Sequence, residues 1–78
     1  MKMNNHYSTK DLSESAFLYS SGKKLAKLDR TDGKVWFVFE DKISCEELSN
    51  SFWRKDALVN AKEFADAIRT LKGLIFNK

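Results

Sequence analysis

The run Val35-Trp36-Phe37-Val38-Phe39 constrains the fold more than any other part of the chain, because all five residues are β-branched or aromatic. These residue types favour an extended strand. Residues 31–34 precede the run and include Gly33, which adopts the positive φ that a tight hairpin turn needs. Residues 25–30 are therefore predicted to be the partner strand of an antiparallel hairpin.

Both faces of this predicted hairpin are apolar. Side chains alternate along a strand, so Val35, Phe37 and Phe39 are expected on one face and Trp36 and Val38 on the other. A hairpin alone is marginally stable and normally leaves one face in water. A chain of 78 residues with one cysteine also gains little net stability from a single core. We therefore expect helices or a second copy to cover both faces, and we predict a homo-oligomer, most simply a dimer.

Three helix starts share one pattern, in which a Ser or Asn cap is followed three residues later by an acid and is flanked by apolar residues. The pairs are Ser8 with Asp11, Ser44 with Glu47, and Asn60 with Glu63. They predict helices over about 9–21, 45–55 and 61–76. The predicted fold is a single small α+β domain over residues 7–76, in the order α-β-β-α-α. An antiparallel hairpin packs with three helices, and residues 1–6 form a disordered N-terminus.

Composition argues against several classes of protein. The chain carries 14 Lys+Arg and 11 Asp+Glu, so its net charge of +3 is low for a protein that binds nucleic acid mainly through phosphate neutralisation. No apolar run approaches the about 20 residues of a membrane span, and no membrane partner is expected. The single cysteine cannot form an internal disulfide, which favours a reducing, cytoplasmic location.

Catalytic and metal-binding side chains are sparse in the sequence. His6 is the only histidine, and it lies near the start of the chain, so no histidine is expected to act as a general base for Cys45 or for a serine. A metal site needs three or four clustered ligands, and the sequence offers no such cluster around His6. Cys45 falls on the apolar stripe of the second predicted helix and is interpreted as a core residue. The three glycines are separate and form no phosphate-binding loop. We predict no catalytic residues, no metal, no cofactor and no enzyme activity.

Aromatic and cationic residues recur together at three places in the chain. A ring that stacks on an aromatic side chain beside a cation is a common way to hold nucleotides and single strands. The candidate ligand-binding residues are Tyr7 and Lys10 before the first helix, Lys27, Arg30, Lys34 and Trp36 in the hairpin, and Trp53, Arg54 and Lys55 at the end of the second helix. Arg30 is expected to face Trp36 across the turn.

These three places form one site only if the hairpin lies between the two helix ends, or if a second subunit joins them. A ligand of such a site would be anionic and would carry a base or another flat ring. The alternative interpretation is that Trp36 and Trp53 pack together in the core while the cations are solvated.

Motifs along nearly the whole chain resemble a known group of domains. They are the opening Tyr7-Ser8-Thr9-Lys10-Asp11-Leu12, the strand Trp36-Phe37-Val38-Phe39-Glu40-Asp41, and Phe52-Trp53 before the last helix. In this order they resemble small phage and prophage domains of unknown function that open with Tyr-Ser-Thr-x-Asp-Leu and carry a Phe-x-Phe strand. The resemblance implies a phage or mobile-element accessory protein and carries over no catalytic residue. The opening also looks like that of excisionase-type helix-turn-helix domains, but a hairpin follows Gly22 in place of a recognition helix.

We therefore expect a non-enzymatic, phage-like accessory protein that sequesters or blocks a host factor in the host cell cytoplasm. The factor would be a host protein or a nucleotide-type signal, and such an activity would suit counter-defence. The alternative is a nucleic-acid-binding accessory or regulatory protein. The salt dependence of binding separates the two, because a nucleic-acid binder loses affinity steeply as salt rises.

Overall fold

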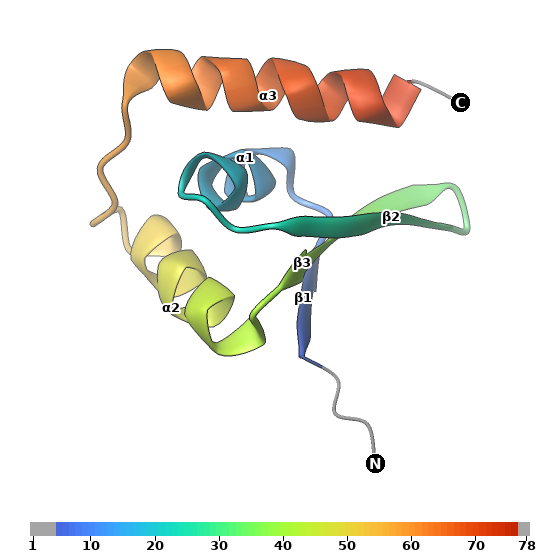
Figure 1. The fold of residues 1–78 in the computed structure, drawn as a ribbon, viewed down its shortest axis with the longest axis horizontal. Helices are drawn as coiled ribbons and strands as arrows, with labels where there is room; N and C mark the ends of the chain where they lie inside the picture. Colours follow the sequence, from blue (N-terminus) through green and yellow to red (C-terminus); the bar gives the residue numbers. More distant parts are fainter. Residues whose placement is uncertain (1–4, 77–78) are drawn as a thin grey trace.

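A computed structural model describes residues 5–76 as a three-stranded sheet with three helices (Figure 1). In chain order these elements are β1 (His6–Thr9), α1 (Leu12–Ser20), β2 (Leu25–Thr31), β3 (Lys34–Glu40), α2 (Lys42–Trp53) and α3 (Ala61–Phe76). The predicted α+β class, the hairpin and the three helices are confirmed. The predicted order lacked β1, which extends the hairpin to an antiparallel sheet of strand order β1-β3-β2.

β1 occupies the segment that was predicted to start the first helix. His6, Tyr7, Ser8 and Thr9 pair with Glu40, Phe39, Val38 and Phe37 of β3, respectively. Because this pairing holds residues 6–9 extended, α1 begins only at Leu12. Its N-cap is Asp11 and not the predicted Ser8, since the Asp11 carboxylate accepts a hydrogen bond of 2.7 Å from the Glu14 N–H.

The expectation of a disordered N-terminus covered residues 1–6. Residues 1–4 lie outside the described part of the chain. His6, by contrast, belongs to β1, and the carbonyl oxygen of Asn5 accepts hydrogen bonds from the backbone N–H groups of Asp41 and Lys42 at 3.1 and 3.2 Å. The ordered domain therefore begins before Tyr7.

Of the predicted caps of the other two helices, the one for α2 is wrong and the one for α3 is confirmed. α2 begins at Lys42, and its N-cap is Asp41, whose carboxylate accepts a hydrogen bond of 3.3 Å from the N–H of Ser44. The predicted cap, Ser44, lies inside the first turn. Asn60 caps α3 as predicted, because its side-chain oxygen accepts a hydrogen bond of 2.9 Å from the Glu63 N–H. None of the described helices, α3 included, is long and apolar enough to cross a membrane.

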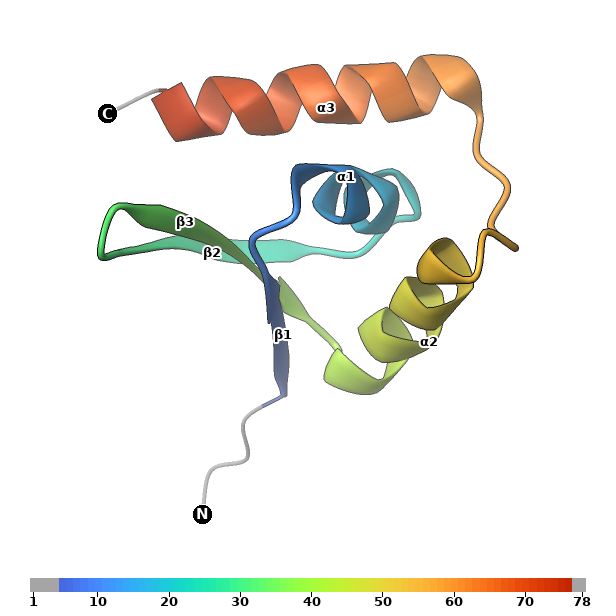
Figure 2. The same cartoon turned by 180° about the vertical axis from the view of Figure 1, so that it is seen from behind.

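The three helices lie on one side of the sheet, with α1 between the sheet and α3 (Figures 1 and 2). Phe37 and Phe39 point to this side and are 1% and 0% exposed. They share a core with Leu18 of α1, Cys45 of α2 and Leu71 of α3. Burying these two rings against three different helices is what holds the sheet and the helical layer together.

The two central residues of β3 on the opposite side of the sheet are Trp36 and Val38. Val38 lies between Ser8 of β1 and Lys27 of β2 and is only 5% exposed, while Trp36 is half-buried. No helix of the part that the structure describes covers this side (Figure 1). Within residues 5–76, the helices therefore cover only one of the two hairpin faces that were expected to be covered.

The turn between β2 and β3 matches its prediction. Asp32 and Gly33 have φ values of 53° and 76°, and two consecutive positive φ values define the hairpin turn that suits the twist of a sheet. Thr31 and Lys34 pair at its base. A β-bulge at Ala26 interrupts the register at the other end of β2.

Candidate functional site

The side of the sheet that faces away from the helices gathers four of the nine predicted ligand-binding residues. We call it the open face and define it by Lys10, Lys27, Lys34 and Trp36. Lys34 and Trp36 alternate with the inward-pointing Phe37 along β3, and Lys27 pairs with Val38. Lys10 follows β1, and its ammonium lies 5.7 Å from the centroid of the Trp36 ring. A cation at this distance is attracted by the negative face of the ring.

The charges around Trp36 are unevenly distributed. Asp29 of β2 pairs directly with Trp36 and accepts a hydrogen bond of 3.0 Å from the Thr31 hydroxyl. Lys10 contacts the ring, and Lys34 lies two positions before Trp36 on the same face of β3. An anion beside the Trp36 ring is therefore favoured towards Lys10 and Lys34 and disfavoured towards Asp29.

Arg30 does not belong to the open face. It pairs with Val35, and its guanidinium donates hydrogen bonds to the carbonyl oxygens of Leu74 and Ile75 at 3.2 and 3.0 Å. The expectation that Arg30 faces Trp36 across the turn is wrong, because Trp36 pairs with Asp29. Arg30 instead satisfies carbonyl groups at the end of α3 that have no partner within the helix.

Tyr7 also points away from the open face, into a buried polar cluster. We use this name for Tyr7, Thr9, Glu14 and Ser49. The Tyr7 hydroxyl donates to Glu14 Oε2 at 2.5 Å and lies 3.0 Å from Ser49 Oγ, and Thr9 donates to Glu14 Oε1 at 2.7 Å. Glu14 is only 3% exposed. The cluster connects β1 with α1 and α2.

Within the buried polar cluster, the enclosure of Tyr7 changes the pKa of its hydroxyl. Burial, and then the hydrogen bond to Glu14, raise the pKa of Tyr7 to about 12. Tyr7 therefore stays protonated and acts as a donor, and the two hydroxyls hold the Glu14 carboxylate in place. A hollow of about 270 Å³ lined by Tyr7, Glu46, Ser49 and Asn50 opens beside it. The hydrogen bonds of the buried polar cluster link β1 to α1 and α2, so we assign the cluster a structural role.

Sequence reasoning overlooked this role of Glu14. Glu14 follows Asp11 by three residues, which is the spacing of a capping box, so the sequence suggested at most a local cap. The side-chain partners of Glu14 are Tyr7 and Thr9, which both lie in β1, and only the pairing of β1 with β3 reveals them.

The predicted residues at the end of α2 lie apart from the open face. α2 and the β2–β3 turn occupy opposite sides of the molecule in both views (Figures 1 and 2). Trp53 is 57% exposed and packs edge-on against Phe52, with ring centroids 5.0 Å apart. Arg54 pairs with Asp56 at 2.9 Å, and Lys55, with a φ of 67°, follows the helix. One chain therefore does not unite the three predicted places.

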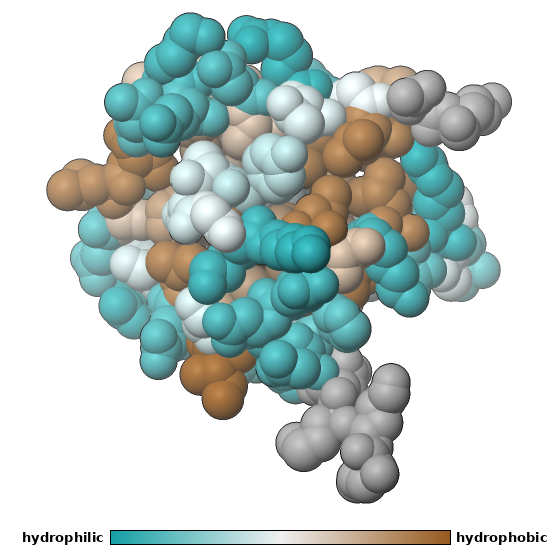
Figure 3. Space-filling view, in the orientation of Figure 1, coloured by the Kyte–Doolittle hydropathy of each residue, from teal (hydrophilic) through white to brown (hydrophobic). Residues whose placement is uncertain are grey.

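The alternative core packing of the two tryptophans is likewise absent from the described residues. Trp36 lies half-buried on the open face, whereas Trp53 is exposed beyond the helical layer. Exposed apolar side chains continue past Trp53 into the α2–α3 connection, at the left of Figure 3, where Leu58 and Val59 are 95% and 47% exposed.

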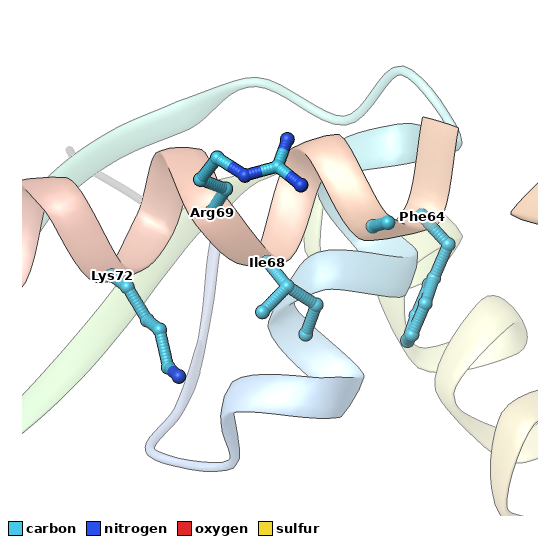
Figure 4. A pocket seen from close by; sticks show the side chains of 5 residues that line it. Phe64, Ile68, Arg69 and Lys72 are labelled. Atoms are coloured by element: carbon cyan, nitrogen blue, oxygen red, sulfur yellow. The ribbon is translucent and has the colours of Figure 1, made fainter. Parts of the chain in front are cut away.

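A hollow of about 470 Å³ lies along α3 (Figure 4). Phe64, Ile68 and Lys72 extend from one side of α3, and Arg69 extends from the other. Arg69 is already paired with Asp66 at 2.8 Å, and the remaining wall is mainly apolar. An anionic ligand is therefore favoured at the open face, where Lys10 and Lys34 flank an aromatic ring.

Cys45 lies in the core, as the sequence indicated. It is 0% exposed, and its thiol lies 3.3 Å from the carbonyl oxygen of Glu40. Burial raises the pKa of the thiol, which lowers its reactivity as a nucleophile. Among residues 5–76, no three His, Cys, Asp or Glu side chains gather closely enough to hold a metal ion.

Comparison with known families yields a match over nearly the whole chain. A family model described as "Domain of unknown function (DUF5659)" matches residues 4–77, and this span contains all nine predicted ligand-binding residues. Searches of curated proteins and of solved structures find no match.

Proposed function

The chain belongs to the domain family DUF5659, and we propose that it is a non-enzymatic binding protein whose open face holds a nucleotide-type ligand. The observation that supports this proposal is the position of Trp36, which lies beside the Lys10 ammonium on the side of the sheet that no described helix covers. The ligand would be anionic and would carry a flat ring.

Stacking on Trp36 is the main source of affinity in this proposal. A base on an aromatic side chain contributes about 1–3 kcal/mol, whereas one exposed cation on a small ligand contributes less. The ring lies at the centre of the sheet, between Asp29 and the Lys10 ammonium, so its position is set by backbone pairing. A ring stacked there would bring an attached phosphate within reach of Lys10.

The position of Asp29 adds a directional element to the proposal. Its carboxylate repels a phosphate on the β2 side of Trp36, so the phosphate would point towards Lys10 and Lys34. Lys27 lies beyond Asp29 along β2 and would contribute only to the general positive potential.

The biological role that we propose is sequestration. A protein that holds a nucleotide-type signal without transforming it lowers the free concentration of that signal, which would suit an accessory protein of a phage or mobile element in the host cytoplasm. The resemblance of the Tyr7–Leu12 opening and the Phe-x-Phe strand to phage domains supports this context. The buried, free thiol of Cys45 is compatible with a reducing compartment.

A nucleic-acid-binding accessory protein is the alternative, and it would use the same face. Single-stranded nucleic acid binds through stacking on aromatic rings beside a line of cations. Lys10, Lys34 and Lys27 provide three cations around Trp36, so the two functions differ in how many phosphates are engaged.

The test uses the intrinsic fluorescence of Trp36. In a Trp53→Phe background Trp36 is the only tryptophan, so a stacked base quenches its emission. Mononucleotides, dinucleotides and a short oligothymidylate serve as probes, each titrated at several salt concentrations. Trp36→Ala and Lys34→Gln are tested by isothermal calorimetry, with Lys55→Gln as the control because it removes the same charge away from the open face.

The proposal predicts saturable quenching by a mononucleotide or dinucleotide, with a salt slope near one charge. It also predicts a loss of about tenfold or more for Trp36→Ala, and no change for Lys55→Gln. Binding of the oligothymidylate alone, with a slope near −0.7 for each phosphate engaged, would establish the alternative. Absence of quenching by every probe would refute both functions at this face.

A further inference from the structure

β2 is an edge strand with a free side. In the sheet order β1-β3-β2, β3 is the neighbour of β2, and its other side has no strand partner among the described residues. β2 runs along the near side of the molecule in Figure 1, and no helix is drawn in front of it there. Such an edge presents unpaired N–H and C=O groups that can add another strand.

The hairpin geometry determines which backbone groups point to the free side. A two-residue turn is closed by a hydrogen-bonded pair, here Thr31 and Lys34, and hydrogen-bonded pairs alternate along an antiparallel ladder. Asp29 therefore directs its N–H and C=O groups to β3. Leu28 and Arg30 direct theirs to the free edge.

We propose that a second copy of this chain binds the edge, with β2 antiparallel to β2 around a two-fold axis at Leu28. Leu28 of each copy would exchange both backbone hydrogen bonds with Leu28 of the other. The two sheets would join into one six-stranded sheet with all helices on the same side. The proposal does not require the ligand proposed for the open face, although Lys27 and Asp29 lie on the same side of the sheet as Trp36.

Charge complementarity selects this register. With Leu28 opposite Leu28, Lys27 of each copy lies directly opposite Asp29 of the other, on the open face. Residues opposite each other without mutual hydrogen bonds have the closest side chains in an antiparallel ladder, and opposite charges there are favourable. The same two residues would thus form two symmetric ion pairs.

The neighbouring registers are disfavoured by the same charges. A shift by two residues in one direction places Lys27 opposite Lys27, and a shift in the other direction places Asp29 opposite Asp29. A shift by one residue places the inward-pointing Leu28 opposite a residue of the open face, so the helices of the two copies would lie on opposite sides. The bulge at Ala26 lies at the end of the paired stretch and leaves Lys27 to Asp29 regular.

Apolar surface beside the edge adds to the proposed contact. The hydrogen bonds from Arg30 to the Leu74 and Ile75 carbonyl oxygens place the end of α3 next to β2. Leu74 and Phe76 are 37% and 79% exposed there, and brown residues lie between α3 and β2 at the right of Figure 3. A second copy along β2 would remove part of this apolar area from water, which backbone pairing alone does not do.

The test uses two charge reversals, Lys27→Asp and Asp29→Lys. Both side chains are exposed, so near-ultraviolet circular dichroism should show an intact fold. Each variant alone places like charges opposite each other across the two-fold axis. In an equimolar mixture of the two variants, every opposite pair again consists of one lysine and one aspartate.

Sedimentation velocity and native mass spectrometry measure the outcome, with a small mass tag on one variant. We expect a wild-type dimer of the 9.0 kDa chain at high-micromolar concentration, a dissociation constant raised about tenfold or more in each variant alone, and a heterodimer of near wild-type affinity in the mixture. Lys42→Asp, a reversal on α2, is the control and should leave the dimer unchanged. A wild-type chain that stays monomeric, or a dimer that ignores both reversals, would overturn the proposal.

Discussion

Replacement of Tyr7 by Phe removes one hydroxyl from the buried polar cluster and leaves the ring in place. The Tyr7 hydroxyl is the donor to Glu14 Oε2, and the Glu14 carboxylate is 3% exposed, so little water can replace the lost hydrogen bond. Thr9 continues to donate to the other oxygen. The variant therefore removes the hydrogen bond to the buried Glu14 carboxylate together with the 3.0 Å contact to Ser49 Oγ.

The cost of this substitution follows from the charge on the acceptor. A hydrogen bond to a charged group contributes about 1.5–3 kcal/mol, and a buried group that loses its partner bears the desolvation penalty in full. We expect Tyr7→Phe to lower the free energy of unfolding by about 2 kcal/mol. A small domain with about 3–5 kcal/mol of net stability would remain mostly folded, so the change can be measured.

Urea unfolding followed by circular dichroism provides the assay, with the m-value checked for constancy. Tyr19→Phe is the matched control, because Tyr19 is 38% exposed and a surface substitution of this kind changes stability by no more than about 0.5 kcal/mol. A double-mutant cycle with Glu14→Gln should show a coupling energy of about 1 kcal/mol or more between positions 7 and 14. Equal unfolding midpoints for Tyr7→Phe and Tyr19→Phe would refute the assigned role of the cluster.

Four further predictions test other parts of the structure. Phe37→Ala should cost about 3–5 kcal/mol and leave the chain largely unfolded by circular dichroism, and a melt close to wild type would show that the inner face is misassigned. By thermal melts, Gly33→Ala should destabilise by about 1–2 kcal/mol because of its positive φ, whereas Gly73→Ala, inside α3 with open space around it, should stabilise by about 0.5–1 kcal/mol. Because the folded-state pKa of Tyr7 is about 12 and its ordinary value is 10.0, the unfolded chain loses this proton first, so its contribution to stability is present below pH 10 and lost as the pH rises towards 12. Wild type should therefore lose more stability than Tyr7→Phe over that interval in urea titrations, and equal losses would contradict the shift. Cys45 should react slowly with a thiol reagent in the native protein and rapidly in urea, and a fast native reaction would place the thiol outside the core.

Local sequence signals predicted the parts of the fold that depend on local interactions. Asn60 caps α3 because no other element competes for residues 60–63, and Gly33 defines the turn because the required φ is a property of the residue itself. At the first two helices, the predicted caps Ser8 and Ser44 each lie three residues from the residue that caps the helix, which is Asp11 for α1 and Asp41 for α2. The choice of Asp11 over Ser8 follows from the pairing of Ser8 with Val38, which is thirty positions along the chain. A local pattern cannot show such a partner.

In the candidate site, too, the features that depend on local structure were predictable and those that depend on long-range contacts were not. Strand alternation placed Trp36 and Phe37 on opposite faces, and the open face follows from that alternation once the helices are known to share one side. The positions of Arg30 and Tyr7 were not predictable in the same way, since their partners are the end of α3 and the buried Glu14. Long-range contacts of single polar side chains leave little trace in the sequence.

The central position of β3 also has a consequence for the order in which the sheet assembles. β2 meets β3 across a two-residue turn, and hairpins of this kind form in about 1–10 μs. β1 reaches β3 only after α1 and β2 have been enclosed in the loop between Thr9 and Phe37, and closing that loop carries a larger entropic cost. We therefore expect β1 to join an existing hairpin late in folding, so the strand that is synthesised first is paired last.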